Sequence, residues 1–472
     1  MNPPEKQIFK NVFSSFFQLQ LTADQDHLVT LLEAFLKDKS DRKLFVLSGY
    51  AGTGKTTMLG AFVKSLNHFK MKTRLLAPTG RAAKVLSNRS SKEAFTIHKQ
   101  IYRRKSSTDE YSPIGLAPNL HTNTVFIVDE ASMIGEFSMH SDGQVGRGLL
   151  DDLLEYVFSG INCRLIFLGD EGQLPPVGST ESPALNVDFL KSNYNSLSIG
   201  EFKLTQVLRQ ADASGILLNA TKLRSIVFPD KIIFKLGSPD FVRLNGELLQ
   251  DELETSYNKF GMEGTIVITR SNKRANQYNQ HIRGRILWYE EQLCNGDCLM
   301  VVKNNYYWLD DDSKAGFIAN GEILRLKRVM KLEHLYGFDF AKVIVEMEDY
   351  PDEPEIEVIL LLESIDCEGP SVKRDRLKSL FFEIEKDYLD ERNKRKRYDK
   401  VLKNPYFNAL QVKYAYAVTC HKSQGGQWES VFIDLGYMTD EMLGQDYYRW
   451  LYTAITRATE KVFLVNFGEE YF

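Results

Sequence analysis

The sequence predicts an α/β protein with two doubly wound parallel sheets, a small hairpin inserted in the first and a small β-barrel inserted in the second. Three observations predict this fold class. Apolar runs of strand length alternate with helical patterns from residue 44 to 168 and again from 264 to 465. A glycine-rich loop joins the first such strand to a helix. Short strand-like runs separated by turns interrupt the second series.

Composition limits the classes of protein that this chain can be. Its 472 residues are 43% hydrophobic and 26% charged, which is typical of a globular protein of two to four domains. The net charge of −4 means that any binding of nucleic acid depends on local basic surface. No apolar run approaches the roughly 18 residues of a membrane span, and no secretory signal is visible, so we expect a cytoplasmic protein without membrane contact. The spacing of the five cysteines favours reduced thiols over a zinc site.

Residues 49–56 read GYAGTGKT and match the pattern G-x-x-x-x-G-K-[ST] of a phosphate-binding loop. Gly49, Gly52 and Gly54 allow backbone conformations in which successive N–H groups point at phosphate oxygens. Lys55 supplies a positive charge to the β and γ phosphates, and the Thr56 hydroxyl is placed to bind Mg²⁺. The loop therefore predicts a site for ATP and Mg²⁺.

The segments on either side of this loop favour the same interpretation over an ordinary glycine-rich turn. Residues 44–47 form a buried strand, and residues 57–64 have helical spacing, so a bound phosphate would lie at a helix N-terminus. The positions predicted to contact the nucleotide are Gln25, Gly49, Ala51, Gly52, Thr53, Gly54, Lys55, Thr56 and Thr57.

Two helices are predicted before the loop. Residues 9–17 are rich in phenylalanine and form a short helix that packs on a core. Residues 21–25 read LTADQ and form a plausible cap for a second helix. The amide of Gln25 could donate and accept on the edge of adenine; a polar residue of the first helical turn is the alternative.

The second strand, residues 73–77, leads through Pro78, Thr79 and Gly80 to a helix that carries Arg81 and Lys84. N–H groups, a hydroxyl and cations together suit a phosphodiester backbone, and a plain turn with solvated cations is the alternative. Residues 96–98 are expected to end the next helical region. The polar, turn-rich residues 102–123 predict the inserted hairpin.

Acidic and amide side chains follow the next two strands. Asp129 and Glu130 come directly after the apolar residues 125–128, where one carboxylate can order Mg²⁺ and the other can orient and deprotonate water. Residues 163–168 form another buried strand, and Gln173 follows it at a position suited to the γ-phosphate. A surface loop is the alternative for Gln173.

The second sheet is predicted from strands at residues 264–269, 413–419, 431–435 and 462–465. The insertion holds strand-like runs at 298–302, 316–323 and 341–345, followed by a long charged helix that includes residues 392–397. The basic side chains of this helix could contact nucleic-acid phosphates, although a solvated helix face is the better interpretation.

Two arginines and one further turn complete the candidate site. Arg209 ends a short amphipathic segment and could point at the nucleotide. Arg457 lies in an otherwise apolar helix, where an unpaired charge would be costly, so it needs an anion. A γ-phosphate between the two sheets would serve, and a buried ion pair with a carboxylate is the alternative. The turn at residues 419–428 is dense in groups that can bind phosphodiesters.

The order of these motifs resembles that of a superfamily 1 DNA helicase of the RecD and Dda type, over nearly the whole chain. The matching blocks are residues 21–25, 49–57, 77–84, 96–98, 129–133, 169–178, 204–210, 418–426 and 452–458. The resemblance implies a RecA-like domain 1A at 1–205, with a strand-separating pin at about 100–121. It also implies a RecA-like domain 2A at 206–293 and 405–472, and an SH3-like insertion 2B at 294–404.

The resemblance also implies roles for individual residues. Gln25 would contact adenine, Thr56 and Asp129 would hold Mg²⁺, and Glu130 would activate water. The residues that would act on the phosphates or the transition state are Lys55, Gln173, Arg209 and Arg457. The residues that would contact single-stranded DNA are Pro78, Thr79, Arg81, His98, Thr419, His421 and Ser423.

The family implies 5′ to 3′ movement on single-stranded DNA, unwinding of duplex DNA, a role in repair, recombination or replication, and a monomeric or weakly self-associating protein. Two features depart from its pattern: residues 102–120 contain no Phe or Trp, and residues 136–147 look like an added loop. A P-loop ATPase that acts as a nucleic-acid-binding switch or clamp shares every nucleotide residue and stays an alternative. RNA as the track is another.

Overall fold

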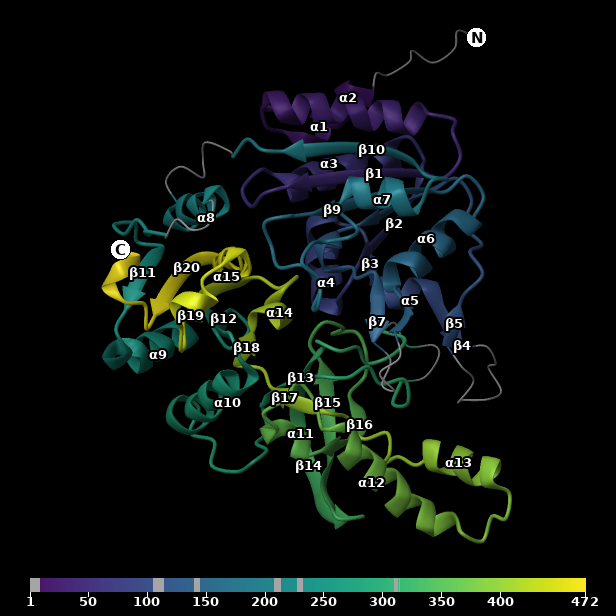
Figure 1. Ribbon diagram of the computed structural model, residues 1–472, viewed down its shortest axis with the longest axis vertical. Coiled ribbons are helices and arrows are strands. Elements are labelled where there is room, and N and C mark those ends of the chain that lie inside the picture. Colours follow the sequence, from purple (N-terminus) through teal and green to yellow (C-terminus); the bar gives the residue numbers. More distant parts are fainter. Residues whose placement is uncertain are drawn as a thin grey trace.

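The computed structural model describes residues 9–104, 114–139, 145–207, 214–226, 232–309, 313 and 315–472. Two parallel sheets and one antiparallel sheet dominate the fold. Figure 1 shows the first parallel sheet in the upper part of the molecule, the second on its left-hand side and the antiparallel sheet below both. The two doubly wound parallel sheets of the predicted fold class are confirmed.

The first sheet has six strands, all parallel. In spatial order they are β10 (Ser198–Leu204), β1 (Lys43–Gly49), β9 (Arg164–Gly169), β6 (Thr124–Val128), β2 (Lys72–Ala77) and β3 (Ala94–Thr96). Strands β1, β9 and β6 are buried along their whole length, which explains why their sequences are continuously apolar rather than alternating. The carboxyl ends of these three strands lie together at one edge of the sheet.

Helices cover both faces of this sheet. One face packs against α1 (Phe9–Phe17), α2 (Ala23–Lys37), α3 (Lys55–His68) and α4 (Gly80–Ser90). The other packs against α5 (Ile97–Ile101), α6 (Leu149–Ser159) and α7 (Val187–Asn193). The predicted cap of α2 is a capping box, in which Thr22 and Gln25 each bond the other's backbone N–H.

Two small antiparallel hairpins extend from the first sheet. Strands β4 (Tyr102–Arg104) and β5 (Ile114–Leu116) pair where the inserted hairpin was predicted, and its tip lies outside the described residues. Strands β7 (Phe137–Met139) and β8 (Val145–Arg147) form the second hairpin within the segment that departs from the family pattern.

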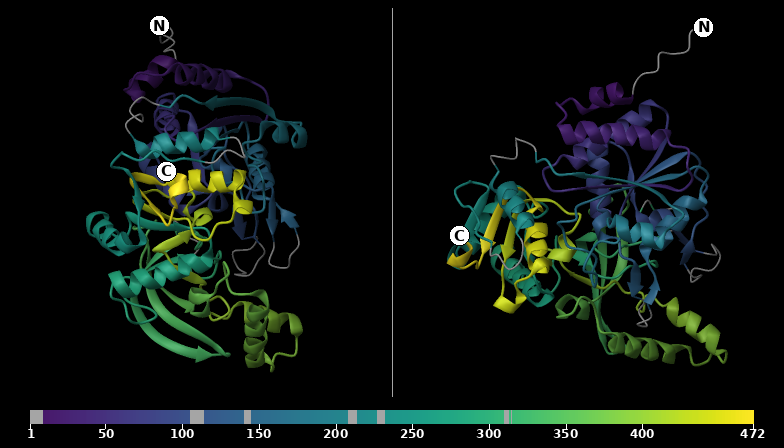
Figure 2. Two further views of the ribbon diagram at one scale, coloured as in Figure 1. Left: turned by 60° about the vertical axis from the view of Figure 1, so that its left-hand side comes forward. Right: turned by 45° about the horizontal axis from the view of Figure 1, so that its top comes forward.

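The second sheet has five parallel strands. In spatial order they are β11 (Phe241–Leu244), β20 (Ala458–Val465), β19 (Trp428–Asp434), β12 (Thr265–Thr269) and β18 (Ala417–Thr419). Helices α8 (Gly215–Ser225) and α15 (Gln445–Ile455) pack on one face, and α9 (Leu249–Phe260) and α10 (Asn272–His281) pack on the other. The short helix α14 (Cys420–Ser423) follows β18. Figure 2 shows this layered unit beside the first one.

The third sheet is antiparallel and has five strands. In spatial order they are β16 (Ile356–Leu361), β15 (Phe338–Met347), β14 (Ile323–Leu335), β13 (Cys298–Val301) and β17 (Val412–Tyr414). Helix α11 (Glu363–Asp366) follows β16, and α12 (Arg374–Glu385) and α13 (Lys394–Leu402) pack against the sheet through a separate apolar cluster. The SH3-like character of this insertion and the domain boundaries stay predictions.

Several predicted elements differ from the observed ones. Residues 413–419 were expected to be one strand, but the chain crosses from β17 of the third sheet to β18 of the second. The strand expected at residues 316–323 is not formed: an isolated bridge lies at Ile318, and the long strand of that region begins only at Ile323. Thr96 starts helix α5 as its N-cap instead of ending a helix. The charged helix is two helices, and α13 begins only at Lys394.

The described residues contain neither a membrane-spanning helix nor a ready-made metal cluster. No helix there is long and apolar enough to cross a membrane. No group of three or more His, Cys, Asp or Glu side chains in the same ranges is arranged to hold a metal ion. All five cysteines are free.

Candidate active site between the two parallel sheets

The phosphate loop runs from the end of β1 to the start of α3. Gly52 and Gly54 have φ angles of 80° and 83°, in the left-handed region that favours glycine. Gly49 does not, and its requirement is space, because a Cβ there would lie 3.0 Å from the Cβ of Leu204 on β10. Two glycines therefore shape the loop, and the third allows a neighbouring strand to approach.

Lys55 lies inside this loop, at the first turn of α3. Its Nζ donates to the carbonyl oxygens of Gly49 at 2.5 Å and of Tyr50 at 2.9 Å. The same Nζ lies 3.9 Å from Oδ2 of Asp170, a carboxylate at the end of β9 that is 1% exposed. The lysine is therefore held by the groups that surround the predicted phosphate position.

Asp129 and Glu130 follow β6 at the same edge of the sheet. The N–H of Glu130 donates to Oδ1 of Asp129 at 2.9 Å. Burial, followed by the charge of Glu130, raises the pKa of Asp129 to about 6. Glu130 has a φ angle of 52°, which is uncommon outside glycine and is often found at functional sites. This conformation turns the chain sharply into the 3₁₀ turn at residues 131–133.

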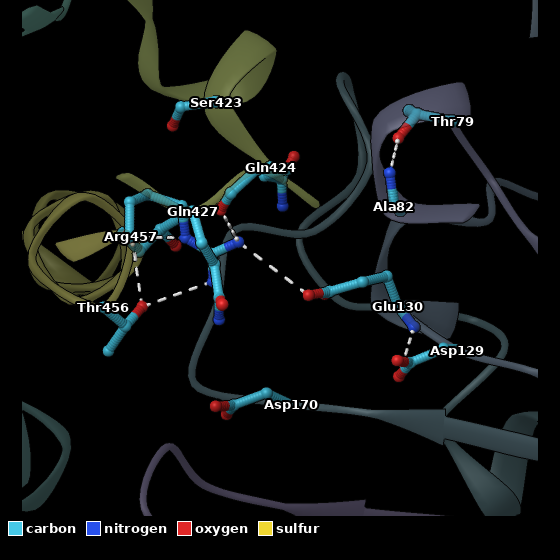
Figure 3. Close-up of polar contacts among 12 residues, drawn as sticks. Thr79, Ala82, Asp129, Glu130, Asp170, Ser423, Gln424, Gln427, Thr456 and Arg457 are labelled. Carbon is cyan, nitrogen blue, oxygen red and sulfur yellow. Dashed lines mark hydrogen bonds and ion pairs between the residues drawn. The ribbon is translucent and has the colours of Figure 1, made fainter. Parts of the chain in front are cut away.

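Arg457 reaches this carboxylate pair from the second sheet, where it lies not within a helix, as expected, but between the end of α15 at Ile455 and the start of β20 at Ala458. Its Nη1 lies 3.8 Å from Oε1 of Glu130, and Figure 3 shows the two side chains facing each other between the sheets. Its Nε donates to the carbonyl of Thr453 at 3.1 Å, and its Nη1 to that of Gly426 at 3.4 Å. Arg457 is 3% exposed, and Glu130 supplies the anion that its buried charge was predicted to need.

A second contact between the sheets was missed by the sequence analysis. The Tyr452 hydroxyl accepts the N–H of Ala51 at 2.8 Å and donates to Oδ2 of Asp170 at 2.7 Å. Burial, together with the negative charge of Asp170, raises the pKa of Tyr452, which keeps the hydroxyl protonated as a donor. Thr453 accepts the N–H of Leu174 at 2.8 Å. The available signal was the position of Asp170 directly after a buried strand.

The two predicted glutamines lie close to this site, but they differ in how many hydrogen bonds their side-chain amides make. Gln25 is 1% exposed, and its Nε2 donates to the carbonyl of Thr53 at 3.2 Å, so it supports the phosphate loop. Gln173 is buried, and its Oε1 has no hydrogen-bond partner within the described part of the chain. It lines a cavity of about 380 Å³ together with Ser48, Lys203 and other residues.

The first turn of α4 meets the turn after α14 across the same boundary. Thr79 caps α4 by accepting the N–H of Ala82 at 3.2 Å. A Cβ on Gly425 would lie 2.8 Å from the Cβ of Ala82, so the two turns touch closely. The Arg81 guanidinium lies 4.2 Å from the centre of the Trp428 ring, and burial lowers the pKa of Arg81.

Comparison with known proteins gives a consistent assignment for these two halves of the site. A model of the AAA domain family matches residues 20–226, and a model of the UvrD-like helicase C-terminal domain matches residues 414–465. These matches cover the phosphate loop, the carboxylate pair and Arg457. The chain is a superfamily 1 helicase of the RecD and Dda type.

Three relatives illustrate how far the similarity of this helicase extends. The uncharacterized protein R530 of Acanthamoeba polyphaga mimivirus is 24% identical over 94% of this chain and 98% of its own length. The ATP-dependent RecD2 DNA helicase of Deinococcus radiodurans is 32% identical over 39% of this chain, but the match spans only 22% of that protein. The ATP-dependent DNA helicase Dda of Enterobacteria phage T4 is 25% identical over 68% of this chain and 70% of Dda.

The remaining residues that were predicted to contact DNA differ in their exposure. His98 lies in α5, with its ring 5.5 Å from that of Tyr102, and burial lowers the pKa of His98 to about 4. Thr419 is the N-cap residue of α14, His421 is exposed, and Ser423 is buried with its hydroxyl bonded to the carbonyl of Cys420 at 2.8 Å.

Two predictions lie outside the described residues. They are the role of Arg209 and the tip of the inserted hairpin. The structure places Lys55, Asp129, Glu130 and Arg457 around one boundary between the sheets. The roles that the sequence assigns to these side chains stay predictions.

Proposed function

We propose that the helicase couples hydrolysis of Mg²⁺-bound ATP, at the boundary between its parallel sheets, to 5′ to 3′ movement on single-stranded DNA. ATP-dependent unwinding of DNA is the activity of the helicase as a member of its superfamily. The proposal adds the polarity, the metal and the residues that act. One observation carries it: Glu130 of the first sheet faces Arg457 of the second at 3.8 Å, beside a phosphate loop.

The donor set at this boundary fits a magnesium nucleotide. Gly52 and Gly54 form the left-handed turn that cradles phosphates, and the hydroxyl of Thr56 lies in the first turn of α3. Asp129 adds a carboxylate that is bonded by one N–H and so keeps oxygen lone pairs for a metal. Thr56 and Asp129 would hold Mg²⁺, which would neutralise developing charge on the phosphates.

The proposed hydrolytic step follows from the contacts of Lys55 and Arg457 that ATP would replace. Phosphate oxygens are stronger partners for Lys55 than the two carbonyls that hold it now. The γ-phosphate likewise draws Arg457 away from Glu130, and this frees the Glu130 carboxylate to orient a water molecule and accept its proton. Arg457 then stabilises the charge of the transition state, as an arginine finger does.

Movement along single-stranded DNA requires that residues of each parallel sheet's domain bind the DNA separately. The α4 turn with Pro78, Thr79 and Arg81 belongs to the first sheet, and the α14 turn with Thr419, His421 and Ser423 belongs to the second. Because these turns touch across the boundary, opening and closing around ATP would change their spacing. Grip on phosphates predicts affinity that falls with salt and little sequence preference.

The hairpin of β4 and β5 is proposed as the pin that separates strands. It extends from the first sheet immediately after His98 and α5, so a strand gripped at α5 would lead to it. A monomeric active form and a cytoplasmic location also stay proposals.

Unwinding of tailed duplexes tests the function directly. One duplex carries a 5′ single-stranded tail and the other a 3′ tail, with ATP and Mg²⁺ present, and Lys55→Ala serves as the inactive control. We expect separation of the 5′-tailed duplex alone. Separation of neither duplex would favour an ATPase switch or clamp, unwinding from the 3′ tail would overturn the polarity, and activity only on RNA-tailed duplexes would reassign the track.

A further inference from the structure

The hydroxyl of Tyr452 is the point at which helix α15 contacts the phosphate loop. The residue is 2% exposed, and its oxygen bonds the N–H of Ala51 and the carboxylate of Asp170 simultaneously. A phenylalanine would fill the same space without either bond. The apolar packing of α15 therefore does not require the hydroxyl, which points to a functional role for it.

Asp170 connects this hydroxyl to Lys55. Its Oδ2 accepts from Tyr452 at 2.7 Å and lies 3.9 Å from Nζ of Lys55. Its Oδ1 accepts the N–H of Gly172 at 2.9 Å, which fixes the orientation of the carboxylate. A Cβ on Gly172 would lie 3.0 Å from the Tyr452 ring, so the ring packs directly on that loop. A change in the position of Lys55 would therefore alter the electrostatic environment of Asp170 and the hydrogen bond between Asp170 and Tyr452.

Tyr452 lies in the last turn of helix α15, which ends at Ile455, two residues before Arg457. Thr453, the next residue, is bonded to the N–H of Leu174 through its hydroxyl and to Nε of Arg457 through its carbonyl. The Nε2 of Gln424 donates to the carbonyl of Leu174 at 2.7 Å, so the loop after β9 is bonded from two elements of the second sheet. A displacement of Tyr452 would consequently move Arg457 with it.

We propose that Tyr452 is a positioning residue that couples occupancy of the phosphate loop to the placement of Arg457. This inference rests on the proposed function. When phosphate draws Lys55 away from Asp170, the carboxylate loses its nearest cation, and its Oδ2 then depends on the Tyr452 hydroxyl while Oδ1 keeps the N–H of Gly172. The strengthened bond holds α15 against the loop, with Arg457 at the γ-phosphate.

The test compares Tyr452→Phe with Tyr447→Phe, a matched change on the same helix. Both tyrosines are 2% exposed, but the Tyr447 hydroxyl bonds Tyr471 at 3.3 Å, within its own domain. We expect Tyr452→Phe to lower kcat for ATP hydrolysis about tenfold with KM within about twofold, because the hydroxyl acts on Arg457 rather than on nucleotide affinity. Tyr447→Phe should leave both parameters within about twofold, and both variants should melt within a few degrees of the wild type.

A double-mutant cycle with Asp170→Asn separates coupling from folding. If Tyr452 acts through Asp170, the losses in kcat from the two single variants should not multiply in the double variant. Equal kcat values for Tyr452→Phe and Tyr447→Phe, or fully multiplicative losses in the cycle, would overturn the inference. Failure of the wild type to unwind DNA would instead count against the proposed function, and ATP hydrolysis without DNA would still test Tyr452.

Discussion

Each of the two parallel sheets of this helicase carries an aspartate at the carboxyl end of one strand. Within the described residues, only one of these two carboxylates has oxygen lone pairs that are free of hydrogen bonds from neighbouring side chains. Asp129 follows β6 of the first sheet, and Asp434 ends β19 of the second. Asp434 is 0% exposed and is bonded by Arg274 at 2.7 Å, Tyr278 at 3.0 Å and Asn466 at 2.6 Å. The Asp129 carboxylate instead accepts the N–H of its neighbour Glu130.

The comparison shows that the carboxyl edge of a parallel sheet is a suitable place for chemistry without being sufficient for it. The second sheet uses its carboxylate to hold its own helix α10, and it contributes to the first sheet's site through α15 instead. The boundary therefore combines an acidic half, proposed to hold Mg²⁺, with a half that supplies Arg457 and Tyr452. Substitutions of Arg457, Glu130, Asp129 and Asp434 test this division.

Arg457→Ala should have the largest effect. This change removes the cation that is proposed to neutralise charge at the γ-phosphate from the second sheet, and we expect kcat for ATP hydrolysis to fall by about 10³ while ATP still binds. Steady-state hydrolysis and binding of a fluorescent nucleotide measure the two properties. Arg449→Ala is the control: Arg449 lies on α15, two helical turns before Arg457, and is bonded to the carbonyl of Thr180, so this variant should stay near the wild type. A fall in kcat of less than about threefold would mean that Arg457 has no catalytic role.

Glu130→Gln should lower kcat by about 10² or more and preserve ATP binding, because an amide can orient water but cannot accept its proton. The matched control is Glu171→Gln, an exposed carboxylate that is paired with Lys203 at 2.6 Å. Turnover near the wild-type rate in Glu130→Gln would assign the base elsewhere.

Asn substitution of the two aspartates should separate stability from activity. Asp434→Asn breaks a bonded carboxylate, so we expect the free energy of unfolding to fall by about 2 kcal/mol while hydrolysis per folded molecule persists. Asp129→Asn should abolish Mg²⁺-dependent hydrolysis with little loss of stability. Denaturant unfolding measures the free energy of unfolding of both variants, and an ATP hydrolysis assay measures their activity. The same pattern in both variants would refute the division between the sheets.

Substitution of Glu322 should have the smallest effect, a change in the free energy of unfolding that depends on pH. It is 2% exposed against the start of α4, and its Oε2 has no hydrogen-bond partner in the described ranges. Burial, and then the charge of Asp349, raise the pKa of Glu322 well above its ordinary value of 4.5, against an opposing effect of Lys84. The folded state thus binds this proton more tightly than the unfolded chain, and that stabilisation is lost as the pH rises above 4.5.

We therefore expect Glu322→Gln to raise the free energy of unfolding by about 1–2 kcal/mol at pH 8, with a smaller difference near pH 4. Urea unfolding at both pH values measures this change. The exposed Glu368, paired with Lys273, is the control position, and its Gln variant should be neutral. A destabilised Glu322→Gln at pH 8 would mean that the carboxylate is charged and paired when folded.

Sequence reasoning succeeded where the pattern is local. The phosphate loop is recognisable because its glycines and lysine must follow one another, and the buried strands because apolar runs of that length between turns rarely form anything else. It failed where the pairing of strands, rather than the local sequence, decides where an element begins and ends. Residues 413–419 have the pattern of one strand, but their halves pair with β13 and β12 of different sheets. Thr96 was expected at a helix end, although its hydroxyl is a typical helix-start signal.

By itself, the sequence determined the nucleotide chemistry: a loop shaped for phosphates, a carboxylate pair at a strand end and an arginine that requires an anion. The tertiary structure alone decided that this anion is Glu130, from the other parallel sheet, and that Tyr452 joins Asp170. The physical reason is that backbone φ angles and apolar periodicity act over a few residues. The contact between Glu130 and Arg457 depends on how two sheets with separate cores pack against each other, which no local pattern specifies.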